Sequence, residues 1–300
     1  MYEQFYGLSE LPFELTANTK YLFLTARHRE ALSMLQYGLG SSKSLTVLVG
    51  EPGTGKTTLI RAALESERCR HVRCVYLNNP SLHSSDFVRL LALRFDLPAE
   101  AATSKALLLE HLERQLLERR DSGETTALVI DEAQALSVEL LEEIRLLANI
   151  ETPSAKLLPL VLAGQPQLAE RLDDKGLVQL KQRITLRCEI RPFDVVDTAA
   201  YIARRLSTAG GVPSQIFSRD AVTLIHERAG GVPRAISVIC DNALVTGMAL
   251  GRRPIDRAVV AEVCGDLRLA SPSGDRPPSG NPVGLATSNS ASASDRMYTE

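Results

Sequence analysis

Residues 45–59 read LTVLVGEPGTGKTTL, and this stretch decides the fold. An apolar run at 45–49 leads into the pattern G-x-x-x-x-G-K-T at 50–57, and a helical pattern follows. The pattern predicts a phosphate-binding loop where it joins a buried strand to a helix, as it does here. Glycines let the backbone curl so that its N–H groups converge on phosphate oxygens, and the helix N-terminus adds its positive end.

Two side chains of the loop have expected roles in nucleotide chemistry. Lys56 supplies a cation to the β- and γ-phosphates, and the Thr57 hydroxyl is a ligand for Mg²⁺. A glycine-rich turn with a surface lysine is the alternative, but it explains neither the strand before the loop nor the helix after it. The residues expected to bind nucleotide are Gly50, Glu51, Pro52, Gly53, Thr54, Gly55, Lys56, Thr57 and Thr58.

A second motif, ALVIDE at 127–132, ends an apolar run in two acidic residues. These acids then lie at the carboxyl edge of a buried strand, where open α/β sheets bind their ligands. We expect Asp131 to hold Mg²⁺ and Glu132 to act as the general base that activates water. Two solvated acids at a strand end are the alternative, which the upstream phosphate loop disfavours because each motif accounts for the other.

Three further polar residues have two interpretations each, and the sequence leaves them open. Gln165 follows the fourth apolar run and either orients the attacking water or senses the γ-phosphate, or else it is a polar strand end. Arg183 precedes the fifth run and is either an arginine finger for a neighbouring subunit or a surface arginine, with Arg171 as a less favoured competitor. Arg234 follows Pro233 at a helix start and either contacts the γ-phosphate or is solvated.

The order of apolar runs and helical patterns predicts an α/β fold. Five short runs alternate with helical stretches, so we expect a five-stranded parallel sheet covered on both faces; they lie at 45–50, 72–78, 127–131, 157–164 and 185–190. Only helical patterns follow residue 192, at 197–209, 219–229, 233–250 and 256–267. The expected division is an α/β nucleotide-binding base at 1–192, a helical lid at 193–269 and a disordered tail at 270–300.

The first 26 residues are rich in aromatic side chains, although such residues make up only 5% of the chain. They are Tyr2, Phe5, Tyr6, Phe13, Tyr21 and Phe23. An irregular segment of this kind must lay its rings either on the core or against a ligand, and the sequence does not distinguish the two.

Composition disfavours several classes of function. The net charge of −2 argues against a protein that depends on attraction to a phosphate backbone, although a local basic patch stays open. No two of the five cysteines form a C-x-x-C pair and no histidines have H-x-x-x-H spacing, which disfavours a disulfide framework and a zinc site. No signal peptide or membrane-spanning run is recognised, so we expect a cytoplasmic protein without a membrane span.

Taken together, these motifs resemble the AAA+ ATPases of the general secretion pathway protein A (ExeA-like) family, which is related to transposition ATP-binding proteins. The resemblance covers about residues 1–269. It rests on MYEQFYGLSELPF at 1–13, YLFLTARHREALSMLQYGL at 21–39, GEPGTGKTTL at 50–59, LVIDEAQ at 128–134, LVLAGQPQL at 160–168, QRI at 182–184 and GGVPRAISVIC at 230–240.

The resemblance implies a P-loop NTPase (AAA+) fold, with a five-stranded base domain, a helical lid and ATP at their junction. It assigns nucleotide binding to residues 50–58, the Mg²⁺ acid to Asp131 and the catalytic glutamate to Glu132. Residues 21–24 and His28 would border the adenine. The sensor and finger roles would fall on Gln165, Arg234 and Arg183.

The function expected from this resemblance is ATP hydrolysis with Mg²⁺ by a homo-oligomer, a ring or a filament. Such an oligomer would assemble or remodel a protein client of a secretion or export machinery. The alternative is an ATP-gated adaptor that binds DNA or a partner, similar to transposition regulators, with slow hydrolysis. ATP-dependent DNA binding that weakens with salt would distinguish the two.

Overall fold

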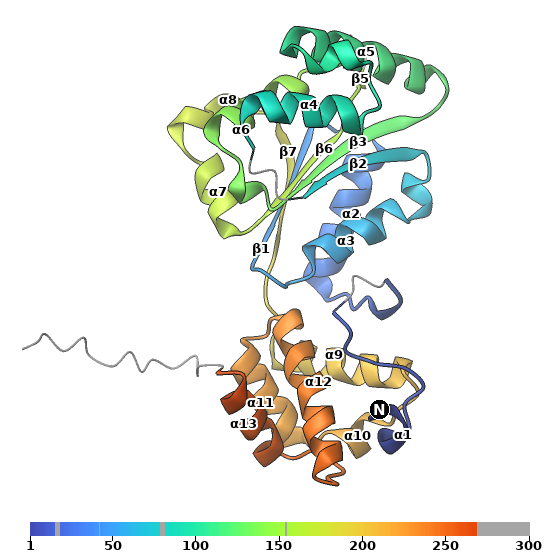
Figure 1. Ribbon diagram of the computed structural model, residues 1–300, viewed down its shortest axis with the longest axis vertical. Helices are drawn as coiled ribbons and strands as arrows, with labels where there is room; N and C mark the ends of the chain where they lie inside the picture. The colour runs from blue at the N-terminus through green and yellow to red at the C-terminus, as the bar shows by residue number, and fades with distance from the viewer. Residues whose placement is uncertain (16–18, 42, 79–81, 154, 269–300) are drawn as a thin grey trace, which may run out of the picture.

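The computed structural model describes residues 1–15, 19–41, 43–78, 82–153 and 155–268. They form an α/β part, at the top of Figure 1, and a helical part below it. The tail expected at 270–300 lies outside the described residues. Within the described ranges, no helix has the length and apolar character needed to cross a membrane.

A five-stranded parallel sheet in the order β2-β3-β6-β1-β7 forms the centre of the α/β part. Its strands are β1 (Leu45–Gly50), β2 (Val72–Asn78), β3 (Thr125–Asp131), β6 (Leu160–Gly164) and β7 (Ile184–Ile190). The three central strands are buried almost throughout, as strands covered on both faces must be. The predicted fold class and the five-stranded sheet are confirmed.

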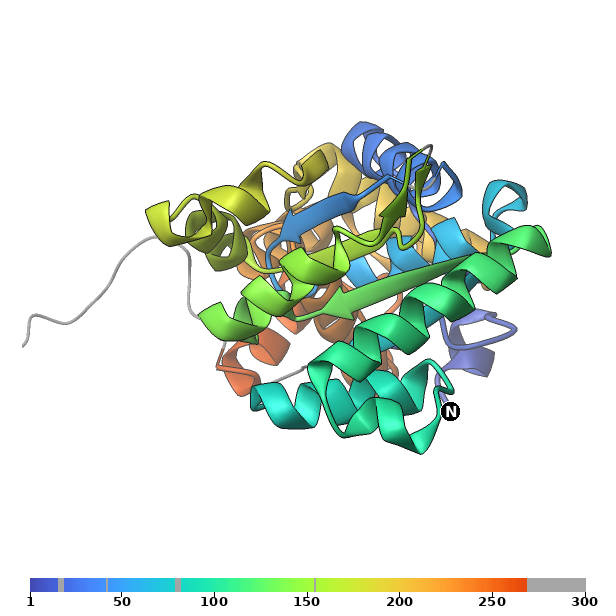
Figure 2. The ribbon, with the colours of Figure 1, turned by 90° about the horizontal axis from the view of Figure 1, so that it is seen from above.

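Helices cover the two faces of this sheet, as Figure 2 shows from above. One face packs against α2 (Ala26–Gly40) and α3 (Lys56–Leu64), through a core of small and branched apolar residues. A larger core on the other face includes α4 (Ser84–Arg94), α5 (Lys105–Asp121), α6 (Val138–Leu147), α7 (Pro166–Leu172) and α8 (Val178–Lys181). A two-stranded hairpin, β4 (Glu151–Thr152) with β5 (Ala155–Lys156), was not predicted.

The helical part contains the four helices that were predicted, each within two residues of its expected ends, and one short extra helix. They are α9 (Val195–Thr208), α10 (Pro213–Ile216), α11 (Arg219–Ala229), α12 (Pro233–Ala249) and α13 (Arg257–Asp266). Asp194, Ser218 and Asp256 cap α9, α11 and α13 by accepting backbone N–H bonds, which fixes where these helices begin.

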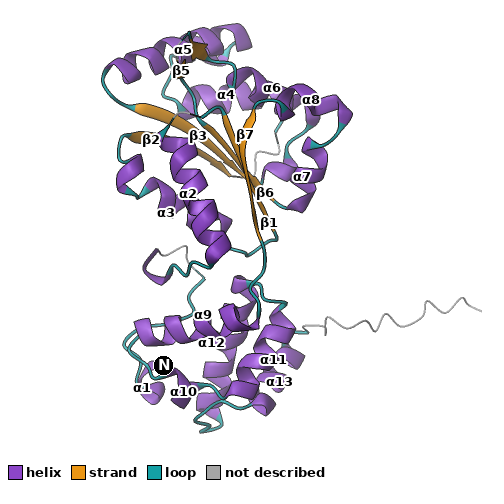
Figure 3. Ribbon diagram, turned by 180° about the vertical axis from the view of Figure 1, so that it is seen from behind, coloured by secondary structure: helices purple, strands orange, loops and turns teal. Residues whose placement is uncertain are grey.

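The N-terminal segment packs on the helical part, although it precedes the α/β part in the chain. The short helix α1 (Glu3–Tyr6) lies beside α10, as Figures 1 and 3 both show. Tyr2, Tyr6 and Phe13 belong to the core of the helical part. The Tyr2 hydroxyl donates to Asp241 Oδ1 on α12 at 2.5 Å. These three aromatic rings therefore have a packing role. The expected domain boundary at residue 192 stays a prediction.

Candidate nucleotide site

The predicted phosphate loop connects β1 to α3 through two left-handed residues. Gly53 has φ +80° and Gly55, which caps α3, has φ +99°, conformations that residues with a Cβ adopt only with strain. Thr54 is buried and donates its hydroxyl to Glu51 O at 2.8 Å, which closes the turn. Glu51 and Pro52 form the exposed outer side of the loop. The first backbone N–H groups of α3 thus stand next to the loop, where they can donate to an anion.

Lys56 lies inside the loop and is only 5% exposed. Its Nζ donates to Gly50 O at 2.8 Å and to Glu51 O at 3.1 Å. Burial lowers the pKa of this ammonium group, and the carboxylates of Glu132 and Asp131 act in the opposite direction. The cation is therefore held next to the loop backbone and faces both acids.

Asp131, at the end of β3, is where three elements meet. Its Oδ2 accepts the Thr57 hydroxyl of α3 at 2.7 Å and the Tyr76 hydroxyl of β2 at 2.5 Å. Its Oδ1 accepts the backbone N–H of Glu132 at 2.9 Å, and the residue is 3% exposed. The structure thus brings together the two predicted metal ligands, Thr57 and Asp131, and adds a tyrosine that sequence reasoning missed.

Glu132 is held by two amide side chains. It has φ +55°, a left-handed conformation that is strained for a residue with a Cβ. Its Oε2 accepts from Gln134 Nε2 at 2.6 Å and from Gln165 Nε2 at 3.3 Å, so the predicted glutamine does reach the predicted base. Gln134 was missed as a site residue, although it stands two positions after Glu132 in LVIDEAQ. Arg171 donates to Gln134 O at 2.6 Å and so is engaged within its own chain.

A cavity of about 470 Å³ opens beside these acids. Its lining comes from α3, β2 and the end of β3: Thr57, Arg61, Tyr76, Asn78, Asp131, Glu132 and Gln134. The acids face an open space large enough for phosphate groups, a metal ion and water.

Arg234 links the helical part to the phosphate loop. Its backbone N–H donates to Gly53 O at 3.2 Å, and a Cβ built on Gly53 would stand 2.7 Å from Arg234 Cβ. Within the described residues, its guanidinium makes no hydrogen bond or ion pair, and the residue is exposed. The side chain therefore starts from the loop and is free to turn toward a phosphate.

Arg183 lies at the opposite end of the strands from the phosphate loop. It immediately precedes β7, and the register pairs Ile184 with Leu45 at the start of β1, whereas Gly50 pairs with Ile190. Six residues of strand separate the two ends of β7, and at about 3.3 Å for each residue this is a distance of roughly 20 Å. The structure therefore does not bring Arg183 to its own phosphate loop.

A second recess beside the loop lies between the N-terminal segment, the loop and the helical part. It is lined by Tyr21, Leu22, Phe23, His28, Thr54, Gly55, Thr58, Leu59, Phe193, Tyr201, Arg205 and Pro233. Phe23, Phe193 and Tyr201 pack edge to face or tilted, with centroids 5.4 to 5.9 Å apart. Tyr21 and Phe23 of the N-terminal segment thus reach the site, whereas Tyr2, Tyr6 and Phe13 pack in the core of the helical part.

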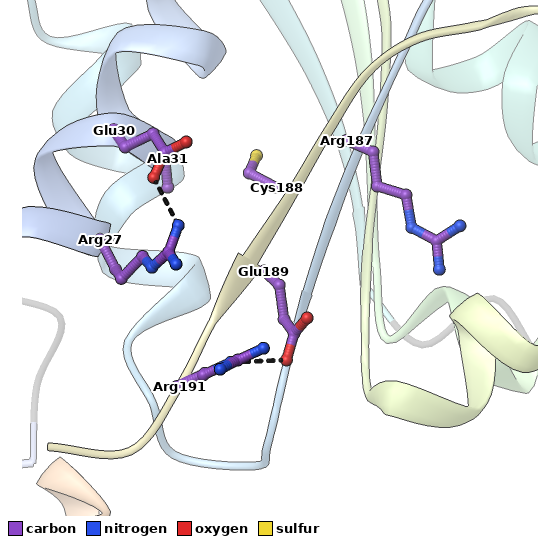
Figure 4. Close-up of a pocket in the computed structure, with 7 residues that line it drawn as sticks. All are labelled: Arg27, Glu30, Ala31, Arg187, Cys188, Glu189 and Arg191. Atoms are coloured by element: carbon purple, nitrogen blue, oxygen red, sulfur yellow. Dashed lines mark hydrogen bonds and ion pairs between the residues drawn. The ribbon is translucent and has the colours of Figure 1, made fainter.

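A further cavity, of about 200 Å³, lies between α2 and β7 and contains no residue of the phosphate loop (Figure 4). Its charged side chains are paired: Arg27 with Glu30 at 3.0 Å, Arg191 with Glu189 at 3.2 Å, and Arg187 with Asp173, outside the cavity, at 3.6 Å. Burial raises the pKa of the Cys188 thiol between them to about 12. The nucleotide motifs therefore lie outside this cavity, and we place the candidate site at the phosphate loop.

Comparison with known proteins agrees with the geometry. A family model described as "AAA domain" matches residues 39–172. General secretion pathway protein A of Aeromonas hydrophila is 41% identical over 271 residues, which is 90% of this chain and 48% of that protein. The chain carries an AAA domain and is related to general secretion pathway protein A. The resemblance inferred from the sequence is confirmed, and the chain spans about half the length of this relative.

Solved structures show the same fold at low sequence identity. The ORC2 protein of Aeropyrum pernix, in ADPNP-ADP complexes, has a TM-score of 0.62 at 17% identity, covering 83% of this chain and 69% of that chain. Cdc6p of Pyrobaculum aerophilum also has a TM-score of 0.62, at 20% identity, covering 83% and 70%. The AAA domain match includes the loop, Asp131 and Gln165 but ends before Arg183 and Arg234.

Proposed function

We propose that this chain binds ATP with Mg²⁺ and hydrolyses it to ADP and phosphate. One observation carries the proposal: the Thr57 hydroxyl lies 2.7 Å from the Asp131 carboxylate, and Glu132 follows at the same sheet edge. A loop for phosphates, two oxygen ligands for a metal and a base for water are therefore adjacent. The match of residues 39–172 to an AAA domain, which includes the loop and both acids, supports the proposal.

The residues present fit Mg²⁺ and phosphate. Hydroxyl and carboxylate oxygens are the ligands that Mg²⁺ prefers, and Thr57 and Asp131 supply one of each. Among the described residues, Lys56 Nζ donates to the loop carbonyls Gly50 O and Glu51 O, so the cation already lies at the loop where the β- and γ-phosphates would bind. When bound, Mg²⁺ would neutralise charge that develops on the phosphate oxygens.

Glu132 is positioned to take a proton from water. Its Oε2 is occupied by Gln134 and Gln165. No residue in the described part of the chain donates to its Oε1, so that oxygen is open to the water it would activate. Arg234, at the start of α12, would contact the γ-phosphate and so couple its presence to the helical part.

The recess on the other side of the loop suits the base of the nucleotide. Its aromatic lining offers faces for stacking, and its walls include Gly55 and Thr58 of the loop. Residues 21–24 and His28 would therefore border the adenine. The base would lie between the N-terminal segment and the helical part.

We further propose that a neighbouring copy completes the site with Arg183. Because this arginine lies about 20 Å from its own loop by strand register, it cannot reach its own nucleotide. In an oligomer, a ring or a filament, it would act on the neighbour, where such a finger contributes about 10³- to 10⁵-fold in rate. The relationship to general secretion pathway protein A supports a client that is a protein of a secretion or export assembly.

The test is ATP hydrolysis with Mg²⁺, measured per subunit as the protein concentration rises, with Glu132→Gln as the control. Specific activity should climb with concentration, and the control should lose activity at least 100-fold. If ATP binds but turnover stays negligible at every concentration, the ATP-gated adaptor is the better function. DNA, with and without ATP, would be added next.

Mixing two inactive variants tests the neighbour's arginine directly. Glu132→Gln removes the base but keeps Arg183, and Arg183→Ala does the reverse. If Arg183 acts between subunits, a mixture contains sites with both groups and regains activity. If Arg183→Ala is fully active alone, or the mixture stays inactive, the finger proposal fails while ATP hydrolysis can still stand.

A further inference from the structure

Tyr76 on β2 reaches across the sheet to the metal-binding carboxylate. The register pairs Asn78 with Asp131, so Tyr76 stands two residues before the facing position, on the same face of the sheet. An aromatic side chain spans such a diagonal, and its hydroxyl donates to Asp131 Oδ2 at 2.5 Å. None of the nucleotide motifs includes this residue.

The hydrogen bonds to Asp131 leave the carboxylate no rotational freedom. Oδ2 accepts from Thr57 and Tyr76, and Oδ1 accepts from the backbone of Glu132. A carboxylate oxygen has two lone pairs, so the two hydroxyls fill Oδ2, whereas the bond from Glu132 leaves one lone pair of Oδ1 for a metal ion. Thr57 is itself a ligand in the proposed site, so its contact with Asp131 would change when a metal ion binds. Tyr76 is then the one side-chain donor among the described residues that holds Oδ2 independently of the ion.

We propose that Tyr76 is a positioning residue for Mg²⁺, acting through Asp131; this rests on the proposed function. A carboxylate already held in one orientation loses little freedom when the ion binds, so binding is stronger. Tyr76 suits this role because it stands on a strand, which fixes its ring better than a loop would. It also lines the 470 Å³ cavity, so the hydroxyl lies at the edge of the space where the ion binds.

The test is the Mg²⁺ dependence of nucleotide binding in Tyr76→Phe, which removes the hydroxyl and keeps the ring. A fluorescent ADP analogue is bound first in EDTA and then under a Mg²⁺ titration. The Mg²⁺ concentration at half-saturation should rise about ten- to hundredfold, the size expected when a group that orients a metal ligand is removed. Binding in EDTA should not change, because the hydrogen bond of Tyr76 within the described residues goes to Asp131 and not to the backbone amides of the loop.

The matched control is Tyr37→Phe, because Tyr37 is exposed on α2 and its ring contacts Lys43. It should behave as the wild type in both measurements. An unchanged or lower Mg²⁺ requirement in Tyr76→Phe would overturn the proposal, since Tyr76 would then be idle or would compete with the ion. A loss of binding in EDTA would also overturn it, as a general packing role. If the wild type shows no Mg²⁺ dependence at all, the proposed function fails as well.

Discussion

The Gln134 side-chain amide bridges two parts of the candidate catalytic site. Its Nε2 donates to Glu132 Oε2 at 2.6 Å, and its Oε1 accepts the backbone N–H of Gln165 at 3.0 Å. Arg171 holds the backbone of the same residue through a bond of 2.6 Å to Gln134 O. The end of β3 and the end of β6 are thereby joined at the base that would activate water.

Replacing Gln134 by Met should slow catalysis without weakening nucleotide binding. Methionine keeps the length of the side chain but cannot hold Glu132, so the base loses its fixed orientation. A misplaced catalytic group costs about 10- to 100-fold in kcat, whereas KM for ATP should change less than about twofold. The control is Gln167→Met, because Gln167 lies exposed on α7. Equal kcat values for the two variants would show that Gln134 is not needed for positioning.

Replacing Gly53 by Ala should disrupt the contact between the phosphate loop and α12. Its φ of +80° strains any residue with a Cβ, and the added atom would meet Arg234 Cβ at 2.7 Å. Gly123→Ala is the matched control, because Gly123 has φ +82° with no atom within 4 Å of the built Cβ. Urea unfolding should show a loss of about 1–2 kcal/mol from strain in both variants. Only Gly53→Ala should also lose nucleotide affinity; equal affinities would contradict the role of this close packing.

The strands were predictable because a strand that is buried on both faces appears in the sequence as a short continuous run of apolar residues. The runs at 45–50 and 72–78 match β1 and β2 at both ends. The fourth run was predicted to begin at 157, but β6 begins at Leu160. Leu157 and Leu158 are buried outside the strand, and Leu157 N–H bonds to Ile150 O, so apolar character there reflects burial and not strand pairing.

The site residues also divide into those that a local sequence pattern identifies and those that only the fold brings to the site. Lys56, Asp131 and Glu132 stand in motifs whose spacing carries the chemistry, so sequence alone placed them together. Tyr76 contacts a residue 55 positions away, and Tyr2 contacts one 239 positions away. Such contacts depend on the order of the strands and on how the N-terminal segment crosses to the helical part, and neither leaves a local pattern.

Phe13→Ala should destabilise the helical part, although Phe13 is near the start of the chain. The ring is 1% exposed and belongs to the core of that part, so its removal leaves a cavity. Such substitutions cost about 3–5 kcal/mol. Hydrogen exchange in α9 and α12 should accelerate, whereas the central strands should keep their protection. Leu15→Ala, at a position 57% exposed, is the control and should have little effect. Faster exchange only in the strands would contradict this prediction, because Phe13 would then stabilise the α/β part and not the helical part.

The ring of His28 has one tautomer that satisfies both of its contacts. Its Nε2 lies 3.2 Å from Thr54 O, which can only accept, so Nε2 carries the proton. Its Nδ1 then accepts the Thr25 hydroxyl at 2.8 Å. Burial lowers the pKa of His28 below its ordinary 6.5, more than Thr54 and Asp197 raise it. The folded protein therefore favours the neutral ring.

This lowered pKa makes stability depend on pH in a defined direction. Below pH 6.5 the unfolded chain binds a proton at His28 more readily than the folded chain does. The free energy of unfolding should therefore fall as the pH drops from 6.5 through the lowered pKa, and this contribution should be constant above 6.5. His28→Gln keeps a donor for Thr54 but does not titrate. Urea unfolding at a series of pH values should show the wild type losing its advantage over this variant on acidification; parallel curves would mean that His28 does not contribute.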